Sequence, residues 1–184
     1  MRDLSLHILD LAQNSVRANA GVVSLEVRLD EEGVLSIVIG DDGDGMDAEL
    51  LSRVLSPFAT TRTTRKVGLG IPMMAENCRL AGGDLSIEST PGRGTRLTAT
   101  LDTASIDCLP LGDLAGTVTT LVTANPDRPE FTLICRSPQG EMQFDTREIK
   151  QALQGVPVNE PEIAAWLLES LREEIDPIFG GVIL

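Results

Sequence analysis

The sequence contains a single histidine and three cysteines, and this scarcity limits the metal and redox chemistry that the chain can carry. Cys78, Cys108 and Cys135 are far apart, and no CxxC pair occurs among them. Zinc sites draw cysteine and histidine ligands from short spacings, and disulfide frameworks belong to cysteine-rich secreted chains. We therefore expect neither a zinc site nor disulfides, and a cytoplasmic location.

The sequence also has no long uninterrupted run of apolar residues. A membrane-spanning helix needs about 20 of them. A secretory signal begins with a basic segment followed by an apolar core, and residues 1–7 (MRDLSLH) do not have this form. We therefore expect no association with a membrane.

Basic residues are few, since 15 lysines and arginines face 28 aspartates and glutamates and give a net charge of −13. Nucleic-acid binding takes most of its affinity from basic side chains that neutralise phosphates, so we expect no nucleic-acid partner. A small polyphosphate remains possible where a metal ion and a local basic loop offset the charge. The 42% of hydrophobic residues can form a substantial core.

Periodicity divides the chain near residue 103. The first part, 1–102, is predicted to fold in the order helix, hairpin, helix, hairpin, with these segments: helix 3–20, strands 22–29 and 34–39, short helix 50–55, loop 57–70, helix 71–80, and strands 84–88 and 95–101. The second part, 103–184, is predicted to be a small α/β domain of unknown role, with helix 113–124, strands 130–136 and 141–144, a helix opened by Asp145 and Glu148, and helix 161–174. The fold class is therefore α+β, a two-layer sandwich with helices on one face of the sheet.

A polar stripe interrupts the first helix at spacings of three and four residues, in the order His7, Asp10, Asn14 and Arg17. Asn14 offers a neutral oxygen that suits Mg²⁺, which prefers octahedral oxygen ligands and often takes several from phosphates. Asp10, one turn earlier, could hold a metal-bound or an attacking water. A solvated helix face would explain the same stripe.

The segment 41–46 (DDGDGM) directly follows the apolar strand 34–39. Its glycines allow the backbone to approach a flat ligand, and Asp41 can accept a hydrogen bond from an exocyclic amine. An acidic turn is the alternative. A calcium loop of the EF-hand type fits less well, because position twelve from Asp41 is Ser52 and not glutamate.

The segment 57–71 (PFATTRTTRKVGLGI) is basic and rich in hydroxyls, and it leads into a predicted helix. A helix N-terminus attracts phosphate through its free N–H groups and its dipole. A random surface loop would not account for this local reversal of charge in an acidic protein.

Taken in order, these segments resemble the nucleotide-binding domain shared by gyrase, heat-shock chaperones, histidine kinases and MutL, the GHKL or histidine-kinase-like ATPase family. The resemblance covers residues 1 to about 102. The matching motifs are the asparagine box (DLAQNS, 10–15), the first glycine box (41–45), the phenylalanine box (Pro57-Phe58 and the threonines), the second glycine box (GLGI, 68–71) and the third glycine box (GRGT, 92–95).

The resemblance implies a mixed sheet of the Bergerat type, ATP and Mg²⁺ as ligands, and a lid over the phosphates from residue 60 to 70. It implies that Asp41 accepts from the adenine amine with help from Gly45 and Thr95, and that Asn14 ligates Mg²⁺. The residue patterns and the resemblance together assign the nucleotide site to Asn14, Asp41, Gly43, Gly45, Met46, Phe58, Thr60, Thr61, Arg62, Lys66, Gly68, Leu69, Gly70, Ile71 and Thr95.

The chain departs from the family at Asp10, where hydrolysing members have a glutamate as general base. Because the carboxylate is one methylene shorter, geometry decides whether it reaches the attacking water. Nothing precedes the ATP-binding region except Met1 and Arg2, so we expect a stand-alone module without a phosphoacceptor segment of its own. His7 is better suited to orienting Asp10, contacting phosphate or capping a polar face than to accepting phosphate.

Three functions remain open at this point. The first is a protein kinase acting on a partner protein that bears the acceptor residue, and the second is a weak ATPase that changes conformation with its nucleotide. The third is a regulatory subunit that binds ATP without catalysis.

Overall fold

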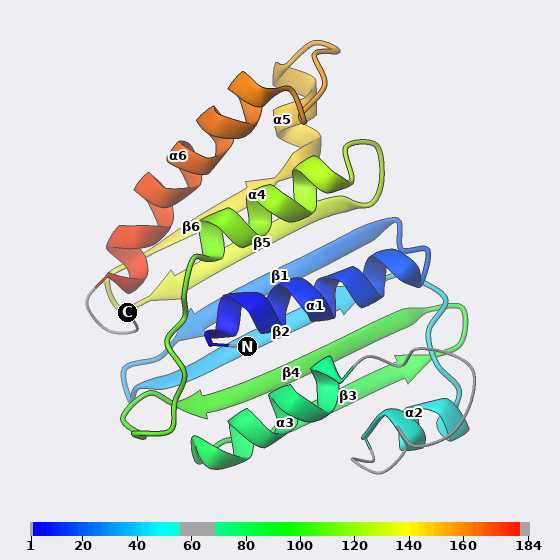
Figure 1. Ribbon diagram of the computed structural model, residues 1–184, viewed down its shortest axis with the longest axis vertical. Helices are drawn as coiled ribbons and strands as arrows, with labels where there is room; N and C mark the ends of the chain where they lie inside the picture. Colours follow the sequence, from blue (N-terminus) through cyan, green and yellow to red (C-terminus); the bar gives the residue numbers. More distant parts are fainter. Residues whose placement is uncertain (1, 56–68, 181–184) are drawn as a thin grey trace.

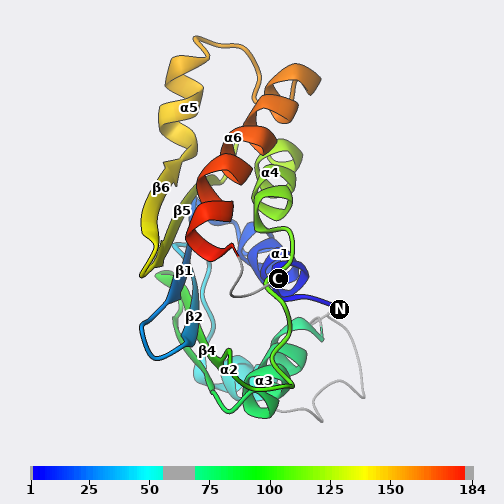
Figure 2. The same ribbon diagram turned by 90° about the vertical axis from the view of Figure 1, so that its left-hand side faces the viewer.

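A computed structural model describes residues 2–55 and 69–180, and it contains one six-stranded sheet with helices packed on one face (Figures 1 and 2). The strand order is β3-β4-β2-β1-β5-β6. The strands are β1 (Val22–Leu29), β2 (Val34–Asp41), β3 (Leu85–Thr90), β4 (Gly94–Asp102), β5 (Glu130–Ser137) and β6 (Gly140–Asp145). The helices are α1 (Leu4–Arg17), α2 (Ala48–Leu55), α3 (Gly70–Leu80), α4 (Leu114–Ala124), α5 (Thr146–Ala152) and α6 (Pro161–Phe179).

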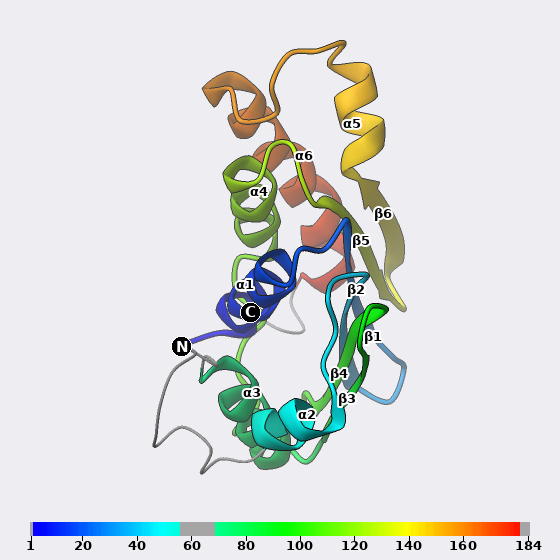
Figure 3. The same ribbon diagram turned by 90° about the vertical axis from the view of Figure 1, so that its right-hand side faces the viewer.

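The alternation of apolar and polar residues along the strands produces the two layers. In β1, Val23, Leu25 and Val27 are buried toward the helices, whereas the residues between them face the other side. The first turns of α1 bury Leu4 and Ile8 against the same core. Burying each such side chain contributes about 2 kcal/mol to folding. The edge-on view in Figure 3 shows the helices on one side and the open face of the sheet on the other. The α+β, two-layer fold class is confirmed.

The sheet is mixed because one pair of central strands is parallel. β1 pairs with β5 in parallel, from Val22 opposite Glu130 to Arg28 opposite Arg136, and the other four pairs of neighbouring strands are antiparallel. The sheet therefore continues across residue 103, where the sequence predicts a boundary. The division into domains 1–102 and 103–184 stays a prediction.

The start of α1 is fixed by the segment that joins β4 to α4. Asp3 caps α1 by accepting a hydrogen bond from the Leu6 amide at 3.0 Å. The amides of Leu4 and Ser5 donate to the carbonyls of Pro110 and Leu111 at 2.9 and 2.8 Å. The connecting segment thus satisfies two of the N–H groups that a helix start leaves free.

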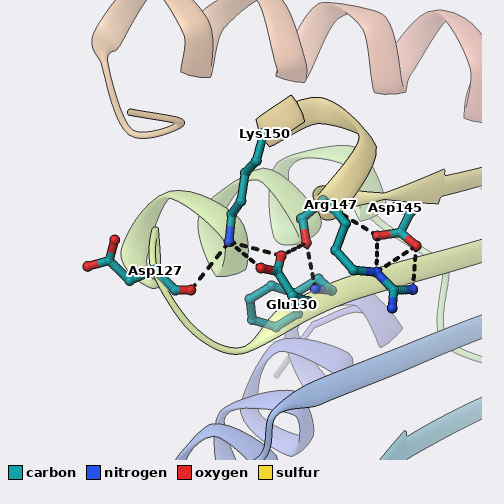
Figure 4. A network of polar contacts seen from close by, with 7 residues as sticks. Asp127, Glu130, Asp145, Arg147 and Lys150 are labelled. Atoms are coloured by element: carbon teal, nitrogen blue, oxygen red, sulfur yellow. Dashed lines mark hydrogen bonds and ion pairs between the residues drawn. The ribbon is translucent and has the colours of Figure 1, made fainter. Parts of the chain in front are cut away.

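A polar network joins the start of β5 to α5 (Figure 4). The Glu130 carboxylate accepts from the Thr146 hydroxyl at 2.5 Å and from Lys150 Nζ at 2.9 Å. The Thr146 oxygen, itself buried, accepts from the Phe131 amide at 2.9 Å. Asp145 caps α5 by accepting from the Arg147 amide, as the sequence predicts.

The last helix extends further than the periodicity predicts. α6 passes Glu174 and Pro177 and ends at Phe179, because Ile175, Ile178 and Phe179 continue its buried face. Trp166 was expected on that apolar face, but it is 49% exposed.

Candidate nucleotide-binding site

The carboxylate of Asp41 is held at the end of β2 by three hydrogen bonds. Oδ2 accepts from the Ser15 hydroxyl at 2.6 Å. Oδ1 accepts from the amides of Gly43 at 2.9 Å and Thr95 at 3.3 Å. Asp41 lies directly opposite Thr95 in the antiparallel register of β2 and β4. These three contacts come from three different segments: α1, the loop that follows β2, and the strand β4. The carboxylate is therefore oriented before any ligand binds.

Asp41 lies at a cavity of about 190 Å³ between the sheet and the helices. The polar residues of its wall are Asn14, Ser15, Asp41 and Thr95. The rest of the wall is mainly apolar and consists of Leu11, Ala18, Ile39, Gly45, Met46, Leu50, Val54, Ile71 and Leu97. A mostly apolar cavity with one fixed carboxylate suits a flat heterocycle that carries an amine.

Two glycines allow the loop after β2 to pack tightly against the β3–β4 hairpin. Gly45 has φ +67, and a Cβ there would lie 2.1 Å from the Thr90 carbonyl oxygen. Gly94 has φ +96, and a Cβ there would lie 1.9 Å from the carbonyl oxygen of Asp41. A side chain at either position would displace backbone, and both would be strained by the positive φ. The glycines of the first and third boxes therefore meet at Asp41.

Asn14 and Asp10 extend the site along α1. Oδ1 of Asn14 accepts from Nη1 of Arg17 at 3.1 Å. One turn earlier, the Asp10 carboxylate lies against Gly70, the first residue of α3, because a Cβ built on Gly70 would be 2.0 Å from Asp10 Oδ2. A carboxylate, a carboxamide and the N-terminus of α3 therefore meet beside the cavity, an arrangement that can hold polar ligand groups.

The structure brings most of the described predicted residues together. Six of them line the cavity: Asn14, Asp41, Gly45, Met46, Ile71 and Thr95. The Gly43 amide contacts Asp41, Gly70 contacts Asp10, and Leu69 precedes α3 with an exposed side chain. Phe58, Thr60, Thr61, Arg62, Lys66 and Gly68 lie outside the described residues. The ligand roles of all these residues stay predictions.

Three polar residues of the site were not among the predicted ligands. Ser15 donates to Asp41, and Arg17 holds Asn14. Ser89 Oγ accepts from the Met46 amide at 2.8 Å and lies 2.8 Å from Thr95 Oγ1, so it joins the loop after β2 to the hairpin. Arg17 could have been found from its place on the polar stripe. Ser89 could not, because nothing local in the sequence predicts its contact with Met46.

Asp42 points away from this cavity and fixes the start of β1. Its Oδ1 accepts from the amides of Gly21 at 2.6 Å and Val22 at 2.8 Å. The Val22 hydrogen bond, followed by those of Gly21 and of its own amide and by the charge of Arg128, lowers the pKa of Asp42 despite partial desolvation. Of the adjacent aspartates, Asp41 is therefore the one that faces the cavity.

His7 is completely buried between α1 and α3. The amide nitrogen of Asn77 lies 2.8 Å from Nε2 and can only donate, so Nε2 accepts and the proton of the neutral ring lies on Nδ1. Nδ1 has no hydrogen-bond partner within the described structure. Burial, and to a lesser extent the charge of the N-terminus, lowers the pKa of His7, although Asp10 and Asp3 oppose the shift. A neutral buried ring is poorly placed to accept phosphate.

The described residues contain no cluster of three or more histidine, cysteine, aspartate or glutamate side chains that could hold a metal ion. No helix within 2–55 and 69–180 has the length and apolar character to cross a membrane.

Comparison with known proteins places this chain in a family. Residues 2–105 match the profile of the histidine kinase-, DNA gyrase B- and HSP90-like ATPases. The chain is 32% identical over 93 residues to the sensor histidine kinase ZraS of Klebsiella oxytoca, an alignment that covers 50% of this chain and 20% of that protein. It is 37% identical over 95 residues to the sensor protein kinase FleS of Pseudomonas aeruginosa, an alignment that covers 51% of this chain and 23% of that protein. The chain belongs to this ATPase family, as the five motifs predict, and it contains an ATP-binding module of the histidine-kinase-like type.

One solved structure extends the likeness to the second part of the chain. A crystal structure described as the N-terminal domain of a DNA repair protein superimposes with a TM-score of 0.50 at 18% identity. The match covers 98% of this chain and 58% of that one, and it concerns the fold alone. The alignments to the sensor kinases span only about a fifth of those proteins.

Proposed function

We propose that this chain binds ATP as its magnesium complex in the cavity beside Asp41 and acts on a partner protein, as a kinase or as a nucleotide-switched regulator. One observation carries the proposal. Asp41 is fixed by Ser15, Gly43 and Thr95 at the wall of a mainly apolar cavity, in a chain of the ATPase family. The cytoplasmic location stays a prediction.

Asp41 reads the adenine by accepting a hydrogen bond from its exocyclic amine. The carboxylate is an acceptor only, and of its about four acceptor sites one, on Oδ2, remains beyond the three contacts that orient it. Guanine presents a carbonyl oxygen where adenine has the amine, so it would leave Asp41 unpaired or face it with a like partial charge. We therefore expect ATP to bind more tightly than GTP by orders of magnitude.

Asn14 supplies the protein oxygen for magnesium, and the fit is supported by its carboxamide beside the cavity. Its Oδ1 accepts one hydrogen bond from Arg17, and its second lone pair could coordinate the ion. Magnesium, when bound, would neutralise phosphate charge. Residues 60–70 are proposed to close over the phosphates.

The role of Asp10 decides whether the phosphoryl group of bound ATP is transferred to a partner, released by hydrolysis, or left in place. Its carboxylate lies at the first residue of α3, which also supports a role beside the terminal phosphate. If it holds an attacking water, it takes the water's proton as general base. A weak ATPase is the second candidate for this reason. A non-catalytic ATP-binding subunit is the third.

The adenine assignment is tested with Asp41→Asn, which keeps the shape but presents an amide in place of a pure acceptor. We expect calorimetry to show loss of ATP binding while the far-ultraviolet circular dichroism stays unchanged. Asp44→Asn is the matched control, because Asp44 belongs to the same loop but its carboxylate contacts only Asn19 among the described residues. Unchanged affinity in Asp41→Asn would refute the assignment.

The three activities are separated with γ-labelled ATP, with and without candidate partner proteins. Label on a partner indicates a kinase, free phosphate indicates an ATPase, and neither indicates binding alone. Asp10→Asn should abolish phosphate release, and intact release would remove Asp10 from the role of general base.

A further inference from the structure

A second hollow lies on the open face of the sheet, behind the candidate nucleotide site. It has a volume of about 420 Å³. It lies over the ends of β1, β2 and β4 and the β3–β4 hairpin. The charged and polar residues that line it include Asp42, Glu88, Arg93 and Arg96, together with Asp41 and Thr95, which also line the candidate nucleotide cavity. The open face is the side that the helices leave uncovered in Figure 3.

The hollow exists because two small residues, Ser24 and Gly40, lie opposite each other near the ends of the central strands β1 and β2. Gly40 on β2 lies opposite Ser24 on β1 and opposite Arg96 on β4. A Cβ at Gly40 would lie 2.7 Å from Ser24 Oγ, so the glycine leaves the space that the serine hydroxyl partly occupies. Arg96 borders this space from one side, and Arg93 in the hairpin turn borders it from another.

Among the described residues, the two arginines of this hollow differ from most basic residues in having no side-chain hydrogen bond or ion pair. Seven basic side chains in the described structure form ion pairs, and Arg17 and Arg128 donate to neutral oxygens. Within residues 2–55 and 69–180, the side chains of Arg2, Arg93 and Arg96 alone form no hydrogen bond or ion pair. Residues 56–68 and 181–184 contain no aspartate or glutamate side chain to pair with them. Two of three unpaired cations in an acidic protein thus line one hollow.

We propose that this hollow is a second ligand site, which binds the phosphate or carboxylate group of a small molecule through Arg93 and Arg96. Guanidinium groups bind such oxyanions with paired N–H donors. The hydroxyl of Thr90, which also lines the hollow, adds a neutral donor, whereas the Ser24 hydroxyl donates to the Gly40 carbonyl at 3.2 Å. Two carboxylates oppose the ligand's negative charge: Asp42, which the amides of Gly21 and Val22 hold, and Glu88, which lies directly opposite Arg96 in the β3–β4 register.

The proposed site shares its strands with the nucleotide site but faces the other way. Gly40 opposite Arg96 and Asp41 opposite Thr95 are consecutive pairs of the same two strands, and side chains alternate faces along a strand. A ligand on Arg96 therefore restrains the strand ends that carry Asp41. Any coupling between the sites would be reciprocal.

The site is tested by titrating the ¹⁵N-labelled full chain with inorganic phosphate, and separately with acetate, at constant ionic strength. We expect saturable amide shifts at Gly40, Gly94 and Arg96 with at least one of the anions. The anion that binds more tightly identifies the ligand group as phosphate or carboxylate. Linear shifts with both anions, or shifts confined to Asn14 and Ile71 at the nucleotide site, would overturn the proposal.

Variants of exposed residues then identify the contacts. Arg96→Gln should weaken binding at least about tenfold, as expected for loss of a charge-assisted contact. Arg28→Gln is the control, because Arg28 on β1 lies on the same open face of the sheet but is paired with Glu26. Glu88→Gln should strengthen binding by removing the opposing charge. Equal affinity in Arg93→Gln, Arg96→Gln and the unmodified chain would refute the site. None of these tests depends on ATP binding.

Discussion

The Ser15 hydroxyl donates a 2.6 Å hydrogen bond to Oδ2 of Asp41, 26 residues further along the chain. Ser15 is buried on α1, and Asp41 ends β2. The bond fixes the rotation of the carboxylate, so that its remaining acceptor capacity is directed at the cavity. Orientation before binding lowers the cost of forming the complex.

Ser15→Ala should therefore weaken ATP binding about tenfold without unfolding the chain. A hydrogen bond to a charged group contributes about 1.5–3 kcal/mol, and water can replace part of it here. Calorimetry measures the affinity, and Ser52→Ala serves as the control because Ser52 donates only to the Glu49 carbonyl on α2. Equal affinity in Ser15→Ala would show that Asp41 needs no support from α1.

Asn14→Ala should remove the contribution of magnesium to ATP affinity. In the unmodified chain we expect tighter binding with Mg²⁺ than with a chelator present, because Asn14 adds a protein oxygen to the ion. In the variant the two affinities should approach each other, while binding in chelator stays similar. A magnesium effect of unchanged size would exclude Asn14 as a ligand.

The β3–β4 hairpin offers a matched pair of glycines. Gly94→Ala should cost about 3 kcal/mol or more of unfolding free energy, because the new Cβ would overlap the Asp41 carbonyl oxygen at a positive φ. Gly92 has a similar φ of +71, but a Cβ there has no atom within 4 Å, so Gly92→Ala should cost about 1 kcal/mol. Urea denaturation measures both, and equal losses would argue against the tight packing at Asp41.

Buried His7 should make the folded state sensitive to mild acid. The pKa of His7 in the folded chain lies below the usual 6.5. Between that lowered pKa and pH 6.5, the unfolded chain therefore binds the proton more readily than the folded chain. The unfolding free energy should therefore fall as the pH drops below about 6.5, by at most about 1.4 kcal/mol per pH unit. Well above pH 6.5 the ring is neutral in both states and contributes no slope.

His7→Gln tests this origin, because glutamine keeps an acceptor for Asn77 but does not titrate. Urea midpoints between pH 7 and pH 5 should stay nearly constant in the variant. The lowered pKa of Asp42 acts in a separate window, since its stabilisation is lost only as the pH falls below about 3.8. Parallel pH profiles in both proteins would remove His7 as the cause.

Local signals in the sequence predicted much of this structure. Asp3 and Asp145 cap their helices as expected, and the loop that contains Asp41 lies at the end of its strand. The resemblance also predicted that the first and third glycine boxes share one site, and Asp41 does contact Thr95. These features depend on short segments whose chemistry can be recognised without the fold.

The features that were missed depend on contacts between distant residues. The parallel pairing of β1 with β5 begins with Val22 opposite Glu130, and no local pattern specifies which strand lies beside β1. The burial of His7 depends on α3, and the hydrogen bond from Ser15 depends on where β2 ends. Only the assembled sheet and helix layer defines these neighbours.

The pairing of β1 with β5 has a practical consequence for fragments of this protein. A fragment that stopped at residue 105, where the family match ends, would have β1 as an edge strand with free N–H and C=O groups. It would also uncover the side of α1 that packs on α4. Exposed edges of this kind recruit other strands, so such a fragment should self-associate more readily than the full chain.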